Sequence, residues 1–200
     1  MKYKICVSGS AVTGTCSPTA EENTKEVGRE IVRQGGVLVT GATIGAPLWA
    51  AIGCKDVKGF SIGISPASTE LEHVKKYKLP TEEFDIIVYT GFGYSGRNLL
   101  LIRSADAVVT VCGRIGTLNE FTIAFEDHKP IGVLTGSGGI AEEIDEIVKE
   151  CGRPNPKIVY DDDPKKLIEK LTKLIDEDKK EIDLSRPVDF QEHKKSQQTG

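Results

Sequence analysis

Residues 105–127 read ADAVVTVCGRIGTLNEFTIAFED and hold a strand pattern, a glycine-containing turn and a helix pattern in that order. The strand pattern, 107–112, is a short run of apolar and β-branched residues, as expected for a strand buried on both faces of a sheet. The helix pattern covers 117–127. A strand, a turn and a helix in succession form the repeating unit of α/β folds with a parallel sheet.

The same unit recurs along the chain. Together with 107–112, the predicted strands are 4–8, 37–40, 60–65, 84–90, 130–135 and 157–160. Helical patterns lie between them, notably at 95–105, and a clear apolar stripe runs through 167–175. With right-handed crossovers, this order predicts a three-layer α/β/α, Rossmann-like, doubly wound parallel sheet of about seven strands. We expect a single domain over 1–177 and a polar tail over 178–200, loosely docked or disordered.

Composition excludes several classes of protein. The 200 residues carry 26 basic and 30 acidic side chains, a net charge of −4, which disfavours a nucleic-acid-binding surface. No apolar stretch approaches the roughly 18 residues of a membrane span, and the first residues lack a signal-peptide pattern, so we expect a cytoplasmic protein. The five cysteines form no CxxC pair and are expected to be reduced thiols. The three histidines lack zinc-like spacing, so no metal site is predicted.

Glycine-rich loops follow four of the predicted strands: SGSAVTG (8–14), TGATIGA (40–46), TGFGYSGRN (90–98) and CGRIGTLNE (112–120). Ligands of open α/β sheets bind beyond the carboxyl ends of the strands, where these loops converge. Each loop exposes backbone N–H groups close to a helix N-terminus, which favours an anion such as a phosphate. The alternative is that the glycines only make tight turns. The candidate ligand-binding residues of the first three loops are Gly9, Ser10, Gly41, Gly45, Gly96 and Asn98.

Two common nucleotide-binding motifs are excluded. Gly9 and Gly14 have the spacing of a P-loop, but Thr15 and Cys16 stand where that motif needs Lys and Ser or Thr. The first loop does not read GxGxxG, and no acidic residue ends the second strand, so NAD and FAD are also disfavoured.

Two charged side chains follow strands near the same edge of the sheet. Arg97 offers a rigid fork for a phosphate or carboxylate, or is a solvated surface arginine. Glu120 follows Thr117 by three residues and either completes a capping box with it or places a carboxylate over a bound phosphosugar. Both alternatives remain open from the residues alone.

The segment GRNLLLIRSADAV (96–108) followed by GRIGTLNE (113–120) resembles the LOG family within the wider SLOG and DprA-like superfamily, with similarity over about 4–150. LOG proteins are phosphoribohydrolases that cleave the N-glycosidic bond of nucleoside 5′-monophosphates, giving a free base and ribose 5-phosphate. The resemblance implies catalytic places for Arg97 and Glu120, no cofactor, and a homodimer or higher homo-oligomer. It assigns the ligand phosphate to the turn that contains Gly113, Arg114, Gly116 and Thr117.

The chain departs from the LOG pattern at two positions. Arg114 stands where the family has a second glycine, and Asn98 stands where it has a lysine. The SGRN and SADA segments are also similar to molybdenum cofactor carrier proteins, which bind a pterin phosphate on the same scaffold.

Two functions therefore remain. One is a phosphoribohydrolase, an enzyme that hydrolyses nucleoside monophosphates. The alternative is a carrier or sensor that binds a nucleotide or the molybdenum cofactor without turnover. In both, the partner is a small phosphorylated ligand rather than nucleic acid or membrane. DprA-like binding of single-stranded DNA is disfavoured by the acidic balance, although Phe92 and Tyr94 could stack on one base.

Overall fold

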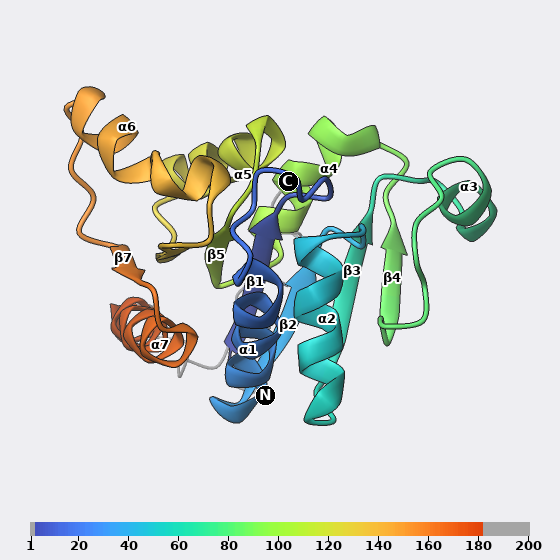
Figure 1. Cartoon of the computed structure of the whole chain (residues 1–200), viewed down its shortest axis with the longest axis horizontal. Helices are drawn as coiled ribbons and strands as arrows, with labels where there is room; N and C mark the ends of the chain where they lie inside the picture. The colour runs from blue at the N-terminus through green and yellow to red at the C-terminus, as the bar shows by residue number, and fades with distance from the viewer. Residues whose placement is uncertain (1–2, 182–200) are drawn as a thin grey trace, which may run out of the picture.

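Seven parallel strands form one sheet in the computed structural model, which describes residues 3–181 (Figure 1). The strands are β1 (Tyr3–Gly9), β2 (Gly36–Thr40), β3 (Ser61–Ser65), β4 (Ile86–Tyr89), β5 (Ala107–Val111), β6 (Ile131–Leu134) and β7 (Ile158–Asp161). Their order in the sheet is β4-β3-β2-β1-β5-β6-β7. Each predicted strand is present, with ends shifted by no more than two residues. The predicted three-layer Rossmann-like fold is confirmed.

Helices cover both faces of the sheet. They are α1 (Ala20–Arg33), α2 (Ala46–Asp56), α3 (Glu70–Lys75), α4 (Gly93–Arg103), α5 (Ile115–Glu126), α6 (Ile144–Glu150) and α7 (Pro164–Glu181), with a 3₁₀ turn, η1, at Gly139–Glu142. One apolar cluster joins α1, α2 and α7 to the sheet, and a second joins α4, α5 and α6 to the opposite face. Successive residues of β1 enter different clusters: Ile5 and Val7 lie in the first and Cys6 in the second. This alternation is the period-2 geometry of a strand buried on both sides.

The winding direction of the sheet reverses at β1. From β1 the chain adds β2, β3 and β4 on one side, and α4 then returns it to β5 on the other side of β1. The loops that leave β1 and β5 therefore run to helices on opposite faces, since α1 and α5 pack in different clusters. Such a reversal opens a crevice at the carboxyl ends of the two strands.

The last helix is longer than the sequence predicts. Because α7 continues to Glu181, residues 178–181 of the predicted tail are helical; the rest of that tail, 182–200, lies outside the described residues. Within residues 3–181, no helix is both long and apolar enough to cross a membrane.

Close packing between α1 and α2 requires two glycines. A Cβ atom on Gly28 would lie 2.1 Å from the carbonyl oxygen of Ala50, and one on Gly53 would lie 1.9 Å from that of Lys25. The two helix backbones therefore touch directly. Part of the glycine content of the chain serves this contact and not the loops.

Replacing Gly28 or Gly53 with alanine should destabilise the fold. Although alanine is the better helix former, the added methyl has to push the two backbones apart, and overpacking of this kind costs about 1–3 kcal/mol. Urea unfolding of each variant measures the loss. Gly14→Ala is the matched control, because a Cβ there meets nothing within 4 Å. Equal stability of all three variants would contradict the tight helix contact.

Candidate functional site

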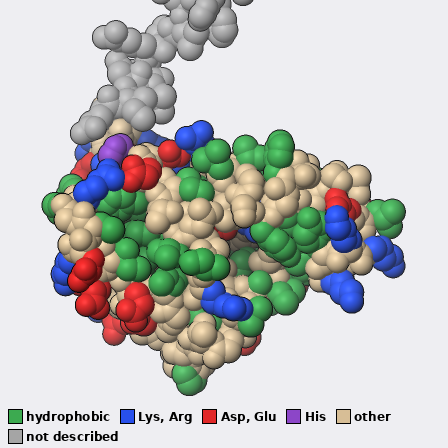
Figure 2. Space-filling view, turned by 90° about the horizontal axis from the view of Figure 1, so that it is seen from above, with side chains coloured by type: hydrophobic (Ala, Val, Ile, Leu, Met, Phe, Trp, Pro, Cys, Tyr) green, Lys and Arg blue, Asp and Glu red, His purple; other side chains and the backbone are tan. Residues whose placement is uncertain are grey.

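A pocket of about 350 Å³ opens at the carboxyl ends of β1 and β5, where the winding reverses. Figure 2 looks onto this end of the molecule, where hydrophobic side chains surround a hollow. The pocket is lined by Gly9, Ser10, Ala11, Val12, Thr43, Tyr94, Arg97, Asn98, Arg114, Ile115, Gly116, Thr117 and Glu120. Loops that follow β1, β2, β4 and β5 all contribute to it, so the expected convergence of the four glycine-rich loops is observed.

The pocket brings together most of the residues singled out from the sequence. These are Gly9, Ser10, Arg97, Asn98, Arg114, Gly116, Thr117 and Glu120. Four other candidates, Gly41, Gly45, Gly96 and Gly113, do not line it. The sequence reasoning also missed Ala11, Val12, Thr43 and Ile115, and it considered Tyr94 only as a stacking group.

Three of the four glycines outside the lining pack closely against residues that line the pocket. A Cβ on Gly41 would lie 2.2 Å from Nη1 of Arg97, so this glycine leaves room for the guanidinium. Gly45 has a φ of +72° and approaches the Ser10 carbonyl oxygen so closely that a Cβ would lie 2.3 Å from it. Gly113, with a φ of +94°, packs against Thr117 in the same way. Gly41, Gly45 and Gly113 therefore allow close packing around the pocket, and their predicted role in ligand binding stays a prediction.

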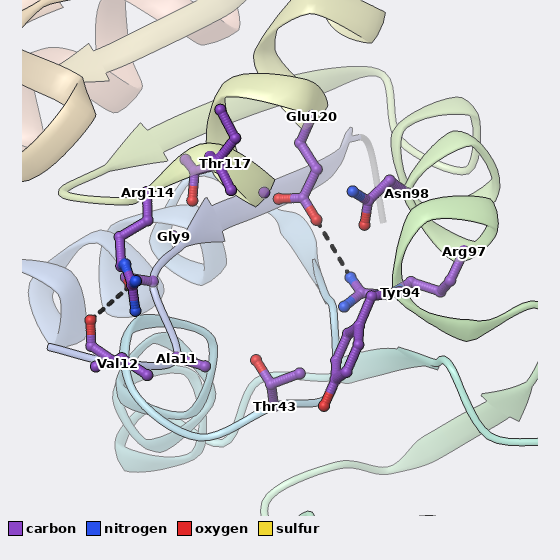
Figure 3. A pocket seen from close by; sticks show the side chains of 13 residues that line it. Gly9, Ala11, Val12, Thr43, Tyr94, Arg97, Asn98, Arg114, Thr117 and Glu120 are labelled. Carbon is purple, nitrogen blue, oxygen red and sulfur yellow. Dashed lines mark hydrogen bonds and ion pairs between the residues drawn. The ribbon is translucent and has the colours of Figure 1, made fainter. Parts of the chain in front are cut away.

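Glu120 is the most constrained side chain of the site. Ser8, at the end of β1, donates from its hydroxyl to Oε2 of Glu120, and Nη1 of Arg97 lies 3.3 Å from Oε1 (Figure 3). The Glu120 and Arg97 side chains are only 9% and 5% exposed. The ion pair is therefore almost completely removed from water.

Asn98 adds a third donor to the Glu120 carboxylate. In one orientation of its amide, the nitrogen donates to Oδ1 of Asn119. In the other, it lies 2.9 Å from both Oε1 of Glu120 and the carbonyl oxygen of Tyr94 and donates to both. The second orientation satisfies two acceptors, and the Asn119 amide then presents its nitrogen instead of Oδ1 to the Asn98 oxygen. Both oxygens of Glu120 then accept hydrogen bonds from protein side chains.

Burial dominates the electrostatics of this carboxyl. It raises the pKa of Glu120 above its ordinary value, while the charge of Arg97 and the hydrogen bond from Ser8 oppose the rise. Within residues 3–181, the buried Nε of Arg97 has no hydrogen-bond partner. Burial of the Arg97–Glu120 pair therefore costs free energy, because both charged groups lose their hydration.

The capping-box interpretation of Glu120 is wrong. Helix α5 begins at Ile115, with Arg114 as its N-cap, and no side chain caps it. Thr117 is therefore the third residue of the helix, and Glu120 lies in the second turn, where it contacts Ser8 and Arg97 instead of the backbone. Arg114 has a φ of −136° and a ψ of −157°, an extended conformation that any residue adopts. A side chain in place of the family glycine creates no backbone strain here.

The expectation of five reduced thiols is also wrong. Cys16, in the loop after β1, forms a disulfide with Cys112, directly after β5. No spacing pattern indicates this pair, because the two residues are 96 positions apart and meet only when β1 and β5 pair. Of the remaining cysteines, Cys6 and Cys54 are buried and Cys151 is exposed, all with free thiols.

The Glu120→Gln change should alter how stability depends on pH. Because the folded pKa of Glu120 is raised, its contribution to stability is complete below the ordinary value of 4.5 and is lost as the pH rises through the folded pKa. Glutamine mimics the protonated form, so the stability of the variant relative to the unmodified protein should increase as the pH rises above 4.5 through the folded pKa. Urea unfolding across this range measures the difference.

Glu126→Gln provides the control, since it removes a carboxylate of the same helix whose side chain is 63% exposed and pairs with Arg153. A relative stability of Glu120→Gln that stays constant or falls with pH would contradict a raised pKa at Glu120.

Comparison with known proteins supports the resemblance found in the sequence. The molybdenum cofactor binding protein of the phototrophic bacterium Rippkaea orientalis is 28% identical, with a TM-score of 0.71, over 88% of this chain and 98% of that chain. The molybdenum cofactor carrier protein of Chlamydomonas reinhardtii is 24% identical, with a TM-score of 0.70, over 88% and 99% of the two chains. The second similarity is evidence for the fold alone.

Sequence comparison extends the same result. An uncharacterized protein of Archaeoglobus fulgidus is 29% identical over 131 residues, which make up 66% of this chain and 81% of that protein. The sequence pattern of the SLOG cluster4 family matches residues 2–168. With a match over most of its length and the fold of its structural relatives, the chain belongs to the SLOG cluster4 family.

Proposed function

We propose that this protein binds a phosphorylated heterocycle of the molybdenum cofactor class, a pterin phosphate, and holds it without hydrolysis. The observation that carries this proposal is the engagement of Glu120. Ser8 donates to one carboxylate oxygen, and Arg97 and Asn98 face the other. A carboxylate that attacks or stabilises an anomeric carbon needs an oxygen free to face the sugar. Here the protein itself occupies both oxygens.

The charge of the pocket favours an anionic ligand. Its lining contains two arginines and one glutamate, and Arg97 and Glu120 pair with each other. The charge of Arg114 is then left to face the pocket at the N-terminal end of α5, where exposed N–H groups also favour an anion. A phosphate group fits this end because a guanidinium can bind it through two parallel hydrogen bonds.

The opposite wall suits a flat ring. Tyr94 is 50% exposed and lines the pocket from the start of α4, while Val12 and Ile115 add exposed apolar surface at the rim on the Arg114 side (Figure 3). An edge-to-face contact with Tyr77, 5.5 Å between ring centroids, supports the Tyr94 ring. Aromatic surface of this kind provides a stacking platform for a heterocycle. A volume of about 350 Å³ is within the range of small-ligand sites.

The relative from Rippkaea orientalis supports the ligand class. It is described as a molybdenum cofactor binding protein, and its similarity to this chain extends over nearly its whole length. A homodimer and a cytoplasmic location, both expected from the sequence, remain part of this proposal.

The second candidate function is the phosphoribohydrolase activity of LOG proteins. The Arg97 and Glu120 pair lies directly in the pocket, and a carboxyl whose pKa is raised by burial is typical of general acids and bases. A ligand that displaced Ser8 or Asn98 from Glu120 would free the carboxylate for this chemistry.

Binding of the molybdenum cofactor tests the first candidate. We expect the purified protein to bind cofactor released from a molybdoenzyme, measured by co-elution of molybdenum and pterin fluorescence on size-exclusion chromatography. Arg114→Ala should weaken binding by about tenfold or more, because a charge-assisted hydrogen bond contributes about 1.5–3 kcal/mol. Arg103→Ala is the control, since Arg103 pairs with Asp127 and does not line the pocket. Absence of binding, or equal binding by both variants, would contradict the proposed site.

Release of free base separates the two candidates. Incubation with a panel of nucleoside 5′-monophosphates, followed by chromatography, should give no base above the level of the Glu120→Gln protein. Base release that is lost in both Glu120→Gln and Arg97→Ala would replace the carrier function with the hydrolase. Ligand-induced thermal shifts in the same samples distinguish a nucleotide that binds without turnover from one that does not bind.

A further inference from the structure

The Cys16–Cys112 disulfide lies at the base of two walls of the pocket. Cys16 ends the segment that begins with the lining residues Ser10, Ala11 and Val12, and Cys112 immediately precedes the segment 113–117 that carries Arg114. The bridge therefore joins the loop after β1 to the loop after β5 across the point where the winding reverses. One covalent bond therefore joins the two segments that line the two sides of the pocket.

Apart from the disulfide, the two loops differ in their exposure and in their contacts with the rest of the protein. Cys112 is fully buried, its N–H donates to the Ser137 hydroxyl at 2.8 Å, and its carbonyl accepts from Ala141 at 2.9 Å. The loop after β1 is more exposed at 11–15, and Val12 is 59% exposed. Backbone contacts with the rest of the chain lie at its two ends: the Ser10 carbonyl accepts from Ala46, the Ser17 N–H donates to Ser137, and Cys16 forms an isolated bridge with Gly138. The disulfide thus anchors an exposed loop to a buried one.

We propose that this disulfide is a redox switch that controls the pocket: the oxidised protein holds its ligand, and reduction by thiols releases the loop after β1 and weakens binding. The inference concerns the same pocket and rests on the proposed function for its biological meaning. A disulfide that pre-organises a binding loop increases affinity because the ordering cost is met before the ligand arrives. After reduction, the loop has to become ordered when the ligand binds, so the affinity falls.

The chemistry is an ordinary thiol–disulfide exchange. An external thiolate attacks the sulfur of Cys16, which is the more exposed partner, and the S–S bond breaks to leave a Cys112 thiolate. A second external thiolate then attacks the mixed disulfide on Cys16, giving an external disulfide and a Cys16 thiolate. Two electrons pass from the two external thiols to the bridge, and each cysteine takes up a proton from water as it forms its thiol. Glutathione or a small dithiol supplies the reductant.

The experiment compares the oxidised and the dithiothreitol-reduced full-length protein. Peptide mapping without reductant should recover a cross-linked Cys16–Cys112 peptide, which reduction removes. Hydrogen exchange followed by mass spectrometry should show faster exchange in 10–17 after reduction, with the strands unchanged. Affinity for the molybdenum cofactor should fall by roughly fivefold or more, the lower end of coupling between linked sites.

Three variants make the test specific. Cys16→Ser and Cys112→Ser should behave like the reduced protein whether or not dithiothreitol is present. Cys151→Ser, which removes the exposed free thiol, should keep the full response.

Failure of the switch and failure of the proposed function give different results. Recovery of Cys16 and Cys112 only as free thiols under oxidising conditions would overturn the switch, as would identical exchange in 10–17 before and after reduction. A cofactor that binds neither form would overturn the proposed function instead, and the exchange measurement would then decide the switch alone.

Discussion

The site depends on keeping one ion pair buried beneath the carboxyl end of the sheet. Arg97 and Glu120 are almost fully removed from water, and burial of two charges is favourable only where their geometry and remaining hydrogen bonds compensate for lost hydration. The surrounding residues meet this requirement. Ser8 and Asn98 donate to the carboxylate, and Gly41 leaves space for the guanidinium that no larger residue would leave. Each comes from a different strand end, so the pair also fixes how these segments lie together.

The sheet topology makes this arrangement possible. Ser8 is the penultimate residue of β1, and Arg97 lies on α4, the helix that crosses from β4 back to β5. Because the winding reverses at β1, the loops on either side diverge and leave a hollow above the pair. The ion pair forms the floor of this hollow, and Arg114 and Tyr94 lie on its walls. A ligand therefore meets a rigid floor and walls that differ in charge and polarity.

Much of this could be predicted from the sequence, and the reasons differ for the fold and the site. Each strand was visible because an apolar run with β-branched residues is a local signal, and the convergence of the glycine loops followed from parallel topology. Ser8, the Cys16–Cys112 disulfide and the role of Gly41 were not visible. All three depend on contacts between segments far apart in sequence, and none has a characteristic spacing. Glu120 was assigned correctly to the pocket lining, but its partners were open until α5 was seen to start at Ile115.

The glycines near the pocket fall into two groups: those that close packing requires and those where a side chain would meet open space. Gly9, Gly41, Gly45 and Gly113 have close neighbours that exclude a Cβ, so substitution there would move a backbone or displace Arg97. Position 114 is different, because its backbone is extended and accepts any residue, and Gly116 faces open space. The start of α5 can therefore change its charge without disturbing the sheet, the ion pair or the loops. Arg114 is such a change: it adds a cation to the wall of the pocket while the floor stays as it is. Under the proposed function, a substitution at the helix start changes the charge that meets the ligand, whereas packing keeps the buried pair and its glycines together.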